Sequence, residues 1–231
     1  MIAVSIVIPH NQVSFDGYET LTKSSEKVQN EFKIEKFDAV TPDLADIVFK
    51  GNGIKWTYPW EGEAIDFASG LIKRAYPTTY PKRRMACFAS HYLLWYRSFK
   101  EDIPLLVLEH DSVFVHKFDP QPIIDSKYDI VGINNPLMAT RRAKKFYDIV
   151  KENKEDIQPV PSIDEWNVPQ GLAGNSAYII KPNGAKELIA AVEKYGAWPN
   201  DALMCKQLIP NMGVTRRFYT KVQGLPSTTT G

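Results

Sequence analysis

The chain has 231 residues, of which 44% are hydrophobic and 24% are charged, and its formal net charge at pH 7 is +1. This length suffices for one large α/β domain or two small ones, and the composition is that of a globular protein. A net charge near zero provides no general attraction for nucleic acid or anionic lipid, so we expect no nucleic-acid partner and any anion site must be built locally.

Two cysteines, Cys87 and Cys205, are too few for a disulfide framework or a cysteine-based zinc site, and we expect both to be buried, reduced thiols. Residues 1–8 lack the basic region and the cleavage site of a signal peptide. No apolar run approaches the roughly 20 residues that a membrane span requires. These features predict a cytoplasmic chain without a transmembrane segment.

The N-terminal region has the pattern of a β-α-β unit. Residues 2–8 form an apolar run that predicts a buried strand ended by Pro9. Residues 18–32 show a moderate helical pattern, and residues 37–40 predict a second short strand. This order is typical of nucleotide-binding α/β folds, but it has low specificity.

Residues 41–82 predict a long irregular loop that is rich in glycine, proline and aromatic residues. Long loops that contain many aromatic residues are often functional, and an aromatic face suits a sugar ring. The alternative is a loop whose aromatic side chains attach it to the body of the protein. The sequence gives the two interpretations equal weight.

A strong helix is predicted over residues 85–99, where apolar residues recur at steps of three and four. Lys82, Arg83 and Arg84 precede it, although cations weaken a helix N-terminus. Their position is explained if they face a phosphate, and a solvated basic patch is the alternative. His91, in the middle of the helix, is expected to be packed and hydrogen-bonded.

The most informative segment is the strand predicted at residues 105–108 and the acidic residues that follow it. Four consecutive apolar residues predict a strand buried on both faces, and Glu109 and Asp111 stand where it ends. Side chains two positions apart on an extended backbone point the same way, so both carboxylates can face one hard cation. Because open α/β sheets bind ligands at this edge, the pair predicts a site for Mn²⁺ or Mg²⁺ carrying a diphosphate. The alternative is a strand that simply ends in polar residues.

The C-terminal half continues the alternation of strands and helices. Strands are predicted over residues 128–133, 176–180 and 214–219, and helices over residues 143–151, 182–195 and 201–209. The polar stretch 136–170 is expected to be mobile or to cover the site. The tail, 226–231, is expected to be frayed, which leaves a single domain over residues 1–225.

Asp201 stands at the start of the last predicted helix, directly after Pro199 and Asn200. A carboxylate there can act as a general base on an acceptor hydroxyl, or it can simply stabilise the helix N-terminus. The sequence contains no P-loop motif, no dinucleotide-binding glycine motif and no Gly-x-Ser-x-Gly motif, which argues against those three classes of enzyme.

Several motifs, in the right order and spacing, resemble those of the lipooligosaccharide-type glycosyltransferases of family 25. Residues 85–95 resemble the family's Cys-Phe-x-Ser-His-x-x-x-Trp helix, and residues 108–114 resemble its strand end with an acidic triplet, usually Glu-Asp-Asp. Residues 174–180 resemble its Gly-Thr-Ala-Gly-Tyr-Ile-Ile strand, and residues 199–201 its Pro-Val-Asp. The likeness is good from residue 81 to residue 205 and poor before that.

The resemblance implies a single GT-A type domain, an α/β fold with a mostly parallel mixed sheet flanked by helices. It also implies a nucleotide-sugar donor (a UDP-hexose), a glycan acceptor, a role in lipopolysaccharide biosynthesis, Mn²⁺ (or Mg²⁺) as cofactor, and inversion at the sugar carbon. Carried over by position, Glu109 and Asp111 hold the metal and Asp201 is the catalytic acid near the acceptor. The remaining candidates are Pro9, His10, Arg83, Arg84 and His110 for donor binding, and Asn175 and Ser176 for acceptor binding.

Departures from the family pattern leave alternatives open. His110 replaces the middle acid of the triplet, which predicts a lower metal affinity. One alternative is therefore a non-catalytic carbohydrate-binding relative whose metal site has decayed. A metal-dependent phosphohydrolase is less well supported, since it needs a second cluster of carboxylate or histidine ligands that the sequence does not show.

Overall fold

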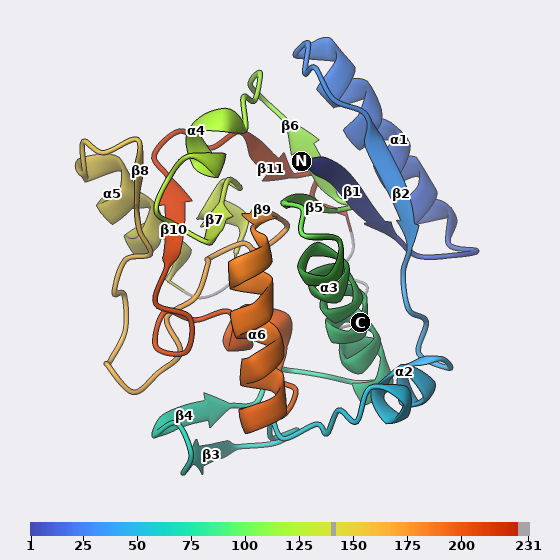
Figure 1. The fold of residues 1–231 in the computed structure, drawn as a ribbon, viewed down its shortest axis with the longest axis vertical. Coiled ribbons are helices and arrows are strands. Elements are labelled where there is room, and N and C mark those ends of the chain that lie inside the picture. Colours follow the sequence, from blue (N-terminus) through green and yellow to red (C-terminus); the bar gives the residue numbers. More distant parts are fainter. Residues whose placement is uncertain (140–141, 226–231) are drawn as a thin grey trace.

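The computed structural model describes residues 1–139 and 142–225, and the predicted tail 226–231 lies outside these residues. The main sheet consists of β1 (Ile2–Val7), β2 (Ile34–Asp38), β5 (Leu105–Glu109), β7 (Ile130–Gly132), β8 (Ile157–Pro159), β9 (Ala177–Ile180) and β10 (Met212–Thr215). These seven strands lie in the order β2-β1-β5-β9-β7-β10-β8 (Figure 1).

The sheet is mixed but mostly parallel, as the sequence predicted. Strand β1 runs parallel to both β2 and β5, and β10 runs parallel to β7. Strand β9 is antiparallel to its neighbours β5 and β7, and β8 is antiparallel to β10. The α/β class with a mostly parallel mixed sheet flanked by helices is therefore confirmed. The single domain over 1–225 stays a prediction.

Helices cover both faces of this sheet, and two antiparallel pairs form separate two-stranded sheets. The helices are α1 (Gln12–Lys27), α2 (Ala45–Gly51), α3 (Pro81–Glu101), α4 (Gln121–Ile124), the 3-10 helix η1 (Pro136–Met138), α5 (Ala143–Glu152), α6 (Pro182–Tyr195) and α7 (Asn200–Leu203). The pairs are β3 (Glu63–Asp66) with β4 (Leu71–Arg74), and β6 (Ser112–Phe114) with β11 (Thr220–Val222). Helices α3 and α6 lie side by side on one face (Figure 1).

Strand β5 is buried on both faces, as its apolar run predicted. Leu105 and Val107 belong to the apolar cluster that contains Trp95 of α3, whereas Leu106 and Leu108 belong to the cluster that contains Leu21 of α1. The alternation of a strand places Glu109, the last residue of β5, on the same face as Leu105 and Val107. His110 and Asp111 form the turn before β6, so the extended backbone expected through residue 111 ends at Glu109.

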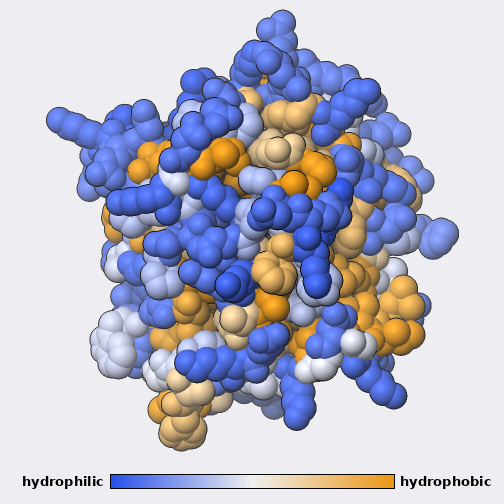
Figure 2. All heavy atoms as spheres, viewed as in Figure 1, coloured by the Kyte–Doolittle hydropathy of each residue, from blue (hydrophilic) through white to orange (hydrophobic). Residues whose placement is uncertain are grey.

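Polar side chains cover most of the face seen in Figure 2, with apolar side chains between them. In the described part of the chain, no helix combines the length and the apolar character needed to cross a membrane.

The first helix begins earlier than the sequence predicted. Helix α1 starts at Gln12 rather than at residue 18, because the Asn11 side chain accepts a hydrogen bond from the Ser14 backbone N–H at 2.9 Å and caps it. Ser14 and Gly17 are among its buried positions. These small residues carry little apolar signal, so the pattern of the sequence does not mark the first turns. The second strand is correspondingly at Ile34–Asp38 rather than at 37–40.

The loop expected over residues 41–82 contains α2 and the β3–β4 pair, and its aromatic residues attach much of it to the body. The Trp56 ring meets the edge of the Phe88 ring of α3 with centroids 6.3 Å apart, and the Tyr58 ring packs against Trp198 at 5.9 Å. Within the segment, the Tyr58 hydroxyl donates to the Arg74 carbonyl at 3.0 Å.

Two predicted elements near the C-terminus are shorter than expected. Helix α7 ends at Leu203 instead of extending to residue 209, because Cys205 forms an isolated bridge with Gly171. Of the strand expected over 214–219, residues 214 and 215 belong to β10, and residues 216–219 connect β10 to β11. Within the polar stretch 136–170, the helix predicted over residues 143–151 is confirmed as α5, and η1 and β8 are present in addition.

Candidate active site

A cavity of about 740 Å³ lies beyond the carboxyl ends of β1, β2 and β5, which is where open α/β sheets bind ligands. Its wall contains eight of the residues that the sequence singled out: Arg83, Arg84, Glu109, His110, Asp111, Asn175, Ser176 and Asp201. The structure thus brings together the metal, acceptor and base candidates and most of the donor candidates.

Pro9 and His10 are not among the described residues of this wall. Ile8 and Asn11 line it instead. His10 has a backbone φ of 58° and an exposed side chain, in the tight connection between β1 and α1. The donor-binding role of Pro9 and His10 stays a prediction without support from their position.

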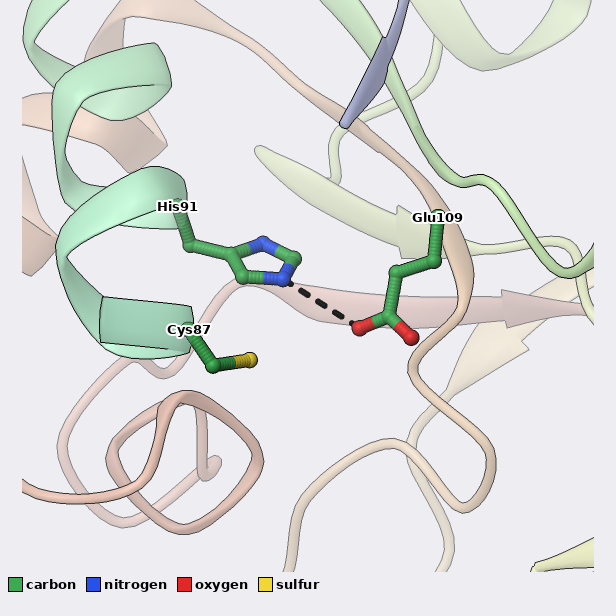
Figure 3. A group of neighbouring side chains, drawn as sticks. All are labelled: Cys87, His91 and Glu109. Carbon is green, nitrogen blue, oxygen red and sulfur yellow. Dashed lines mark hydrogen bonds and ion pairs between the residues drawn. The ribbon is translucent and has the colours of Figure 1, made fainter. Parts of the chain in front are cut away.

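Glu109 is held by a histidine on α3. The His91 ring is 1% exposed, and its Nε2 lies 3.3 Å from Oε1 of Glu109 (Figure 3). On the other side of the ring, Nδ1 lies 2.8 Å from the hydroxyl of Tyr178 on β9. The Trp95 indole N–H donates to that same hydroxyl at 2.8 Å.

The chemistry of these groups fixes the direction of each hydrogen bond. An indole N–H can only donate, so the Tyr178 oxygen accepts from Trp95, and its own proton is left for Nδ1 of His91. The His91 proton then resides on Nε2, which donates to the Glu109 carboxylate. This one arrangement satisfies every group, and it holds Glu109 in a defined orientation. The expectation of a packed, hydrogen-bonded His91 agrees with this network.

Asp111 has an unusual environment for a carboxylate. Burial, and secondly the charge of Glu109, raise the pKa of Asp111 to about 7. Its Oδ1 is buried and has no hydrogen-bond partner within the described residues. Two carboxylates with so little neutralising charge beside them fit a divalent cation, because hard cations take oxygen ligands and supply the missing positive charge.

His110 stands in the turn directly after β5 and lines the same cavity as Glu109. Its Cδ2 is 3.3 Å, and its carbonyl oxygen only 2.8 Å, from where a Cβ on Gly17 of α1 would be, so the residue packs closely against that helix. Burial lowers the pKa of His110, against the opposing effects of Glu109 and the Ile6 backbone, so the ring is predominantly neutral at pH 7. Histidine at this position therefore leaves the Glu109–Asp111 pair in place.

Cys87 is a wall residue that the sequence reasoning treated as structural only. Its Sγ, Nε2 of His91 and a carboxylate oxygen of Glu109 lie within 4.8 Å of one another (Figure 3). Burial, followed by nearby carboxylates, raises the pKa of this thiol, so it is protonated at pH 7. Both cysteines are free, as predicted, but of the two only Cys205 is fully buried, because Cys87 borders the cavity and is partly exposed. The spacing 84, 87, 91 on one helix face would have indicated that Cys87 shares the wall with Arg84 and His91.

Asp201 enters the cavity from a different element. It is in the first turn of α7, and its side chain is exposed to the space of the cavity. The protein atoms around this side chain nevertheless raise the pKa of Asp201, an effect that the charge of Arg84 opposes. A carboxylate with a raised pKa is a stronger base, which suits proton abstraction. Arg84 itself is fixed, since its Nε donates to Thr78 Oγ1 at 2.9 Å and its guanidinium lies 5.0 Å from the Tyr76 ring.

The segment that follows β11 closes the cavity. Val222, Gly224 and Leu225 line the wall, and the side-chain amide of Gln223 donates to the carbonyls of Gly17 and His110 at 2.9 and 3.1 Å. The end of the described chain thereby joins α1 to the end of β5.

A carboxylate pair at the end of a strand and a separate carboxylate on another wall of a large cavity are the parts that a group-transfer enzyme requires. The chain belongs to glycosyltransferase family 25: a model of the family described as "Glycosyltransferase family 25 (LPS biosynthesis protein)" matches residues 19–204. The family assignment that the motifs indicated is confirmed.

Individual relatives are distant. The chain is 23% identical over 107 residues to the lipooligosaccharide biosynthesis protein lic2B of Haemophilus influenzae, a match that spans 46% of this chain and 40% of that protein. Among solved structures it is similar to mouse xyloside xylosyltransferase 1, with a TM-score of 0.48, 11% identity and cover of 91% and 83% of the two chains. It is also similar to the bifunctional glycosyltransferase WbbM, with a TM-score of 0.43, 9% identity and cover of 92% and 38%.

Proposed function

We propose that this chain transfers a hexose from a nucleoside-diphosphate sugar, a UDP-hexose, to a hydroxyl of a glycan acceptor in lipopolysaccharide biosynthesis, with Mn²⁺ or Mg²⁺ as cofactor and with inversion. The observation that carries this proposal is the presence of Glu109, Asp111 and Asp201 on the walls of one cavity. Family 25 membership supplies the reaction class. The cytoplasmic location stays a prediction.

The donor side of the site is assigned to the end of β5 and the entrance of α3. Glu109 and Asp111 would hold the metal, which when bound neutralises the charge of the diphosphate leaving group. His91 keeps the Glu109 carboxylate oriented through its Nε2–H. Arg84 adds a fixed positive charge on the same wall. Arg83, His110 and the Ile8–Asn11 connection complete the proposed donor side.

The acceptor side is assigned to α7 and the segment before β9. Asp201 takes the proton from the acceptor hydroxyl as that oxygen attacks the sugar carbon, and its raised pKa favours this role. Asn175 and Ser176, both nearly buried, line the wall beside it. Inversion requires the acceptor hydroxyl, at Asp201, to attack the sugar carbon from the side opposite the diphosphate at the Glu109–Asp111 pair.

The two alternatives are less well supported. Decay of the metal site through His110 is less well supported, because Glu109 and Asp111 both still line the cavity. A phosphohydrolase would need a second ligand cluster, and within residues 1–139 and 142–225 one group of three metal-ligating residues is found, Cys87, His91 and Glu109.

The test is calorimetric binding of UDP-hexoses with and without Mn²⁺, followed by transfer assays. We expect metal-dependent binding in the wild type, and its loss in Asp111→Asn. The control is Asp38→Asn, which alters a carboxylate at the end of β2 that is paired with Lys36 and is not among the described lining residues. Equal donor binding in Asp111→Asn and wild type would contradict the metal assignment, and absence of any donor binding would contradict the proposed function.

A further inference from the structure

A second, smaller cavity of about 150 Å³ adjoins the first. Ala139, Gly174 and Asp201 line both cavities, so the proposed base stands where the two meet. The smaller cavity lies between β4 and the segment 163–173. These two parts are joined directly, since the Ile72 backbone N–H donates to the Asn167 carbonyl at 2.7 Å.

The walls of the smaller cavity combine aromatic and polar groups. The rings of Tyr58 and Tyr76, with centroids 5.8 Å apart, form one part of the wall, and Arg74 lies beside them. Asp164 contributes a carboxylate to the same wall. Its side chain is 7% exposed and lies 3.5 Å from the Arg142 guanidinium. A cavity of this size admits one sugar ring but not a nucleoside diphosphate.

We propose that this cavity binds the terminal sugar ring of the acceptor, and that this ring is an uncharged pyranose; the inference rests on the proposed function. Tyrosine faces accommodate the C–H faces of a pyranose, and carboxylates and a guanidinium accept from and donate to its hydroxyls. A ring seated here presents a hydroxyl to Asp201 at the junction, while the donor occupies the larger cavity. The hydroxyl proton passes to the Asp201 carboxylate as the new glycosidic bond forms and the bond to the diphosphate breaks.

The charge of the wall selects against an acidic sugar. Arg74 is engaged with Glu63 at 2.8 Å and Asp164 with Arg142 at 3.5 Å, so each of these wall charges has an opposite charge beside it. Asp201 stands at the junction, and a uronic acid or a phosphorylated sugar would bring a further negative charge close to its carboxylate; like charges at close range disfavour binding.

The β3–β4 pair offers a matched test of the position. Ile72 lines the smaller cavity and not the larger one, and Ile65 is paired with it across the two strands but is 57% exposed and not among the described lining residues. Ile72→Phe puts a larger side chain at the cavity wall, whereas Ile65→Phe makes the same change one strand further out. We expect Ile72→Phe to raise the acceptor KM about tenfold or more and to leave the donor KM within about twofold. Ile65→Phe should leave both constants near wild type.

The acceptors for this test are the methyl glycosides of glucose and galactose and their uronic acid counterparts. We expect transfer to a neutral glycoside and at least about tenfold lower kcat/KM for the matching uronide. Unchanged acceptor KM in a folded Ile72→Phe, or a uronide that equals or exceeds its neutral counterpart, would overturn the inference while leaving glycosyl transfer intact. If Ile72→Phe does not fold, the uronide comparison on wild type decides. Failure of the proposed function is distinct, because the wild type would then bind no UDP-hexose.

Discussion

Tyr178→Phe removes one hydroxyl from the centre of the network that orients Glu109. Tyr178 is fully buried, and its hydroxyl makes two hydrogen bonds of 2.8 Å, one from the Trp95 indole and one to Nδ1 of His91. The substitution leaves both partners buried without a hydrogen bond. Each buried group without a partner costs about 1–3 kcal/mol, so we expect the free energy of unfolding to fall by about 2–6 kcal/mol.

The same substitution should weaken metal binding at a distance. Without the Tyr178 proton, Nδ1 of His91 has no donor, and the tautomer that places a proton on Nε2 toward Glu109 is no longer fixed. Loss of a residue that orients a metal ligand typically costs about 10–100-fold in metal affinity, and we expect a decrease of this size for Mn²⁺.

The assays are urea denaturation for stability and calorimetry for Mn²⁺ affinity, with Tyr92→Phe as the control. Tyr92 is also buried, on the same helix as His91, but it takes no part in this network. We expect the control to lose less than about 1 kcal/mol and to keep its Mn²⁺ affinity. If Tyr178→Phe behaved like Tyr92→Phe in both assays, the deduced hydrogen-bond directions would be wrong. A loss of stability with unchanged Mn²⁺ affinity would show that His91 does not orient Glu109 for metal.

Three further predictions follow from the site. The folded chain retains the Asp111 proton up to about pH 7, whereas the ordinary pKa of Asp is 3.8. The metal-free protein should therefore become less stable as the pH rises from about 4 through 7. Urea denaturation should show this trend in the wild type and a flatter profile in Asp111→Asn. Asp201→Asn should reduce the transfer rate by roughly 10²–10⁴-fold and keep the donor affinity. Near-normal turnover in this variant would show that another residue is the base. Gly171→Ala should lower stability and transfer together, since its Cβ would lie 2.6 Å from the Asp201 carbonyl and 2.7 Å from the Met204 carbonyl; unchanged melting and turnover would contradict this packing.

The sequence was most informative where a single strand determines the geometry. The apolar run of β5 predicts its burial and the position of Glu109 at its end, because the alternation of a strand is a local property. Asp111 reaches the same cavity from the turn that follows, and not by strand alternation. The family motifs also indicated the positions of α3 and of the start of α7. The sequence did not predict that β9 runs antiparallel to its neighbours β5 and β7, since strand pairing depends on the path of the whole chain.

The contacts that complete the site come from residues far apart in the sequence. The hydroxyl of Tyr178 is 87 positions from His91, and the Tyr178 strand motif by itself gives no sign of that contact. The smaller cavity is likewise formed by segments far apart in the sequence, from 58–76, 139–174 and 201–202, and the sequence predicted no regular structure for most of the first two. The cavity exists because the β3–β4 pair lies beside residue 167, and the local sequence does not predict this contact between distant segments.

The closure of the cavity by residues 222–225 has a consequence for how the protein matures. Strand β1, at the very beginning of the described chain, and the Gln223 side chain, almost at its end, meet around the last residues of β5. Pairing of such distant segments is slow, because the intervening chain must be ordered first. A nascent chain on the ribosome therefore contains the metal pair, and even Asp201, well before it has an enclosed site. Donor affinity should appear late and in one step during synthesis, rather than increase as each strand is added.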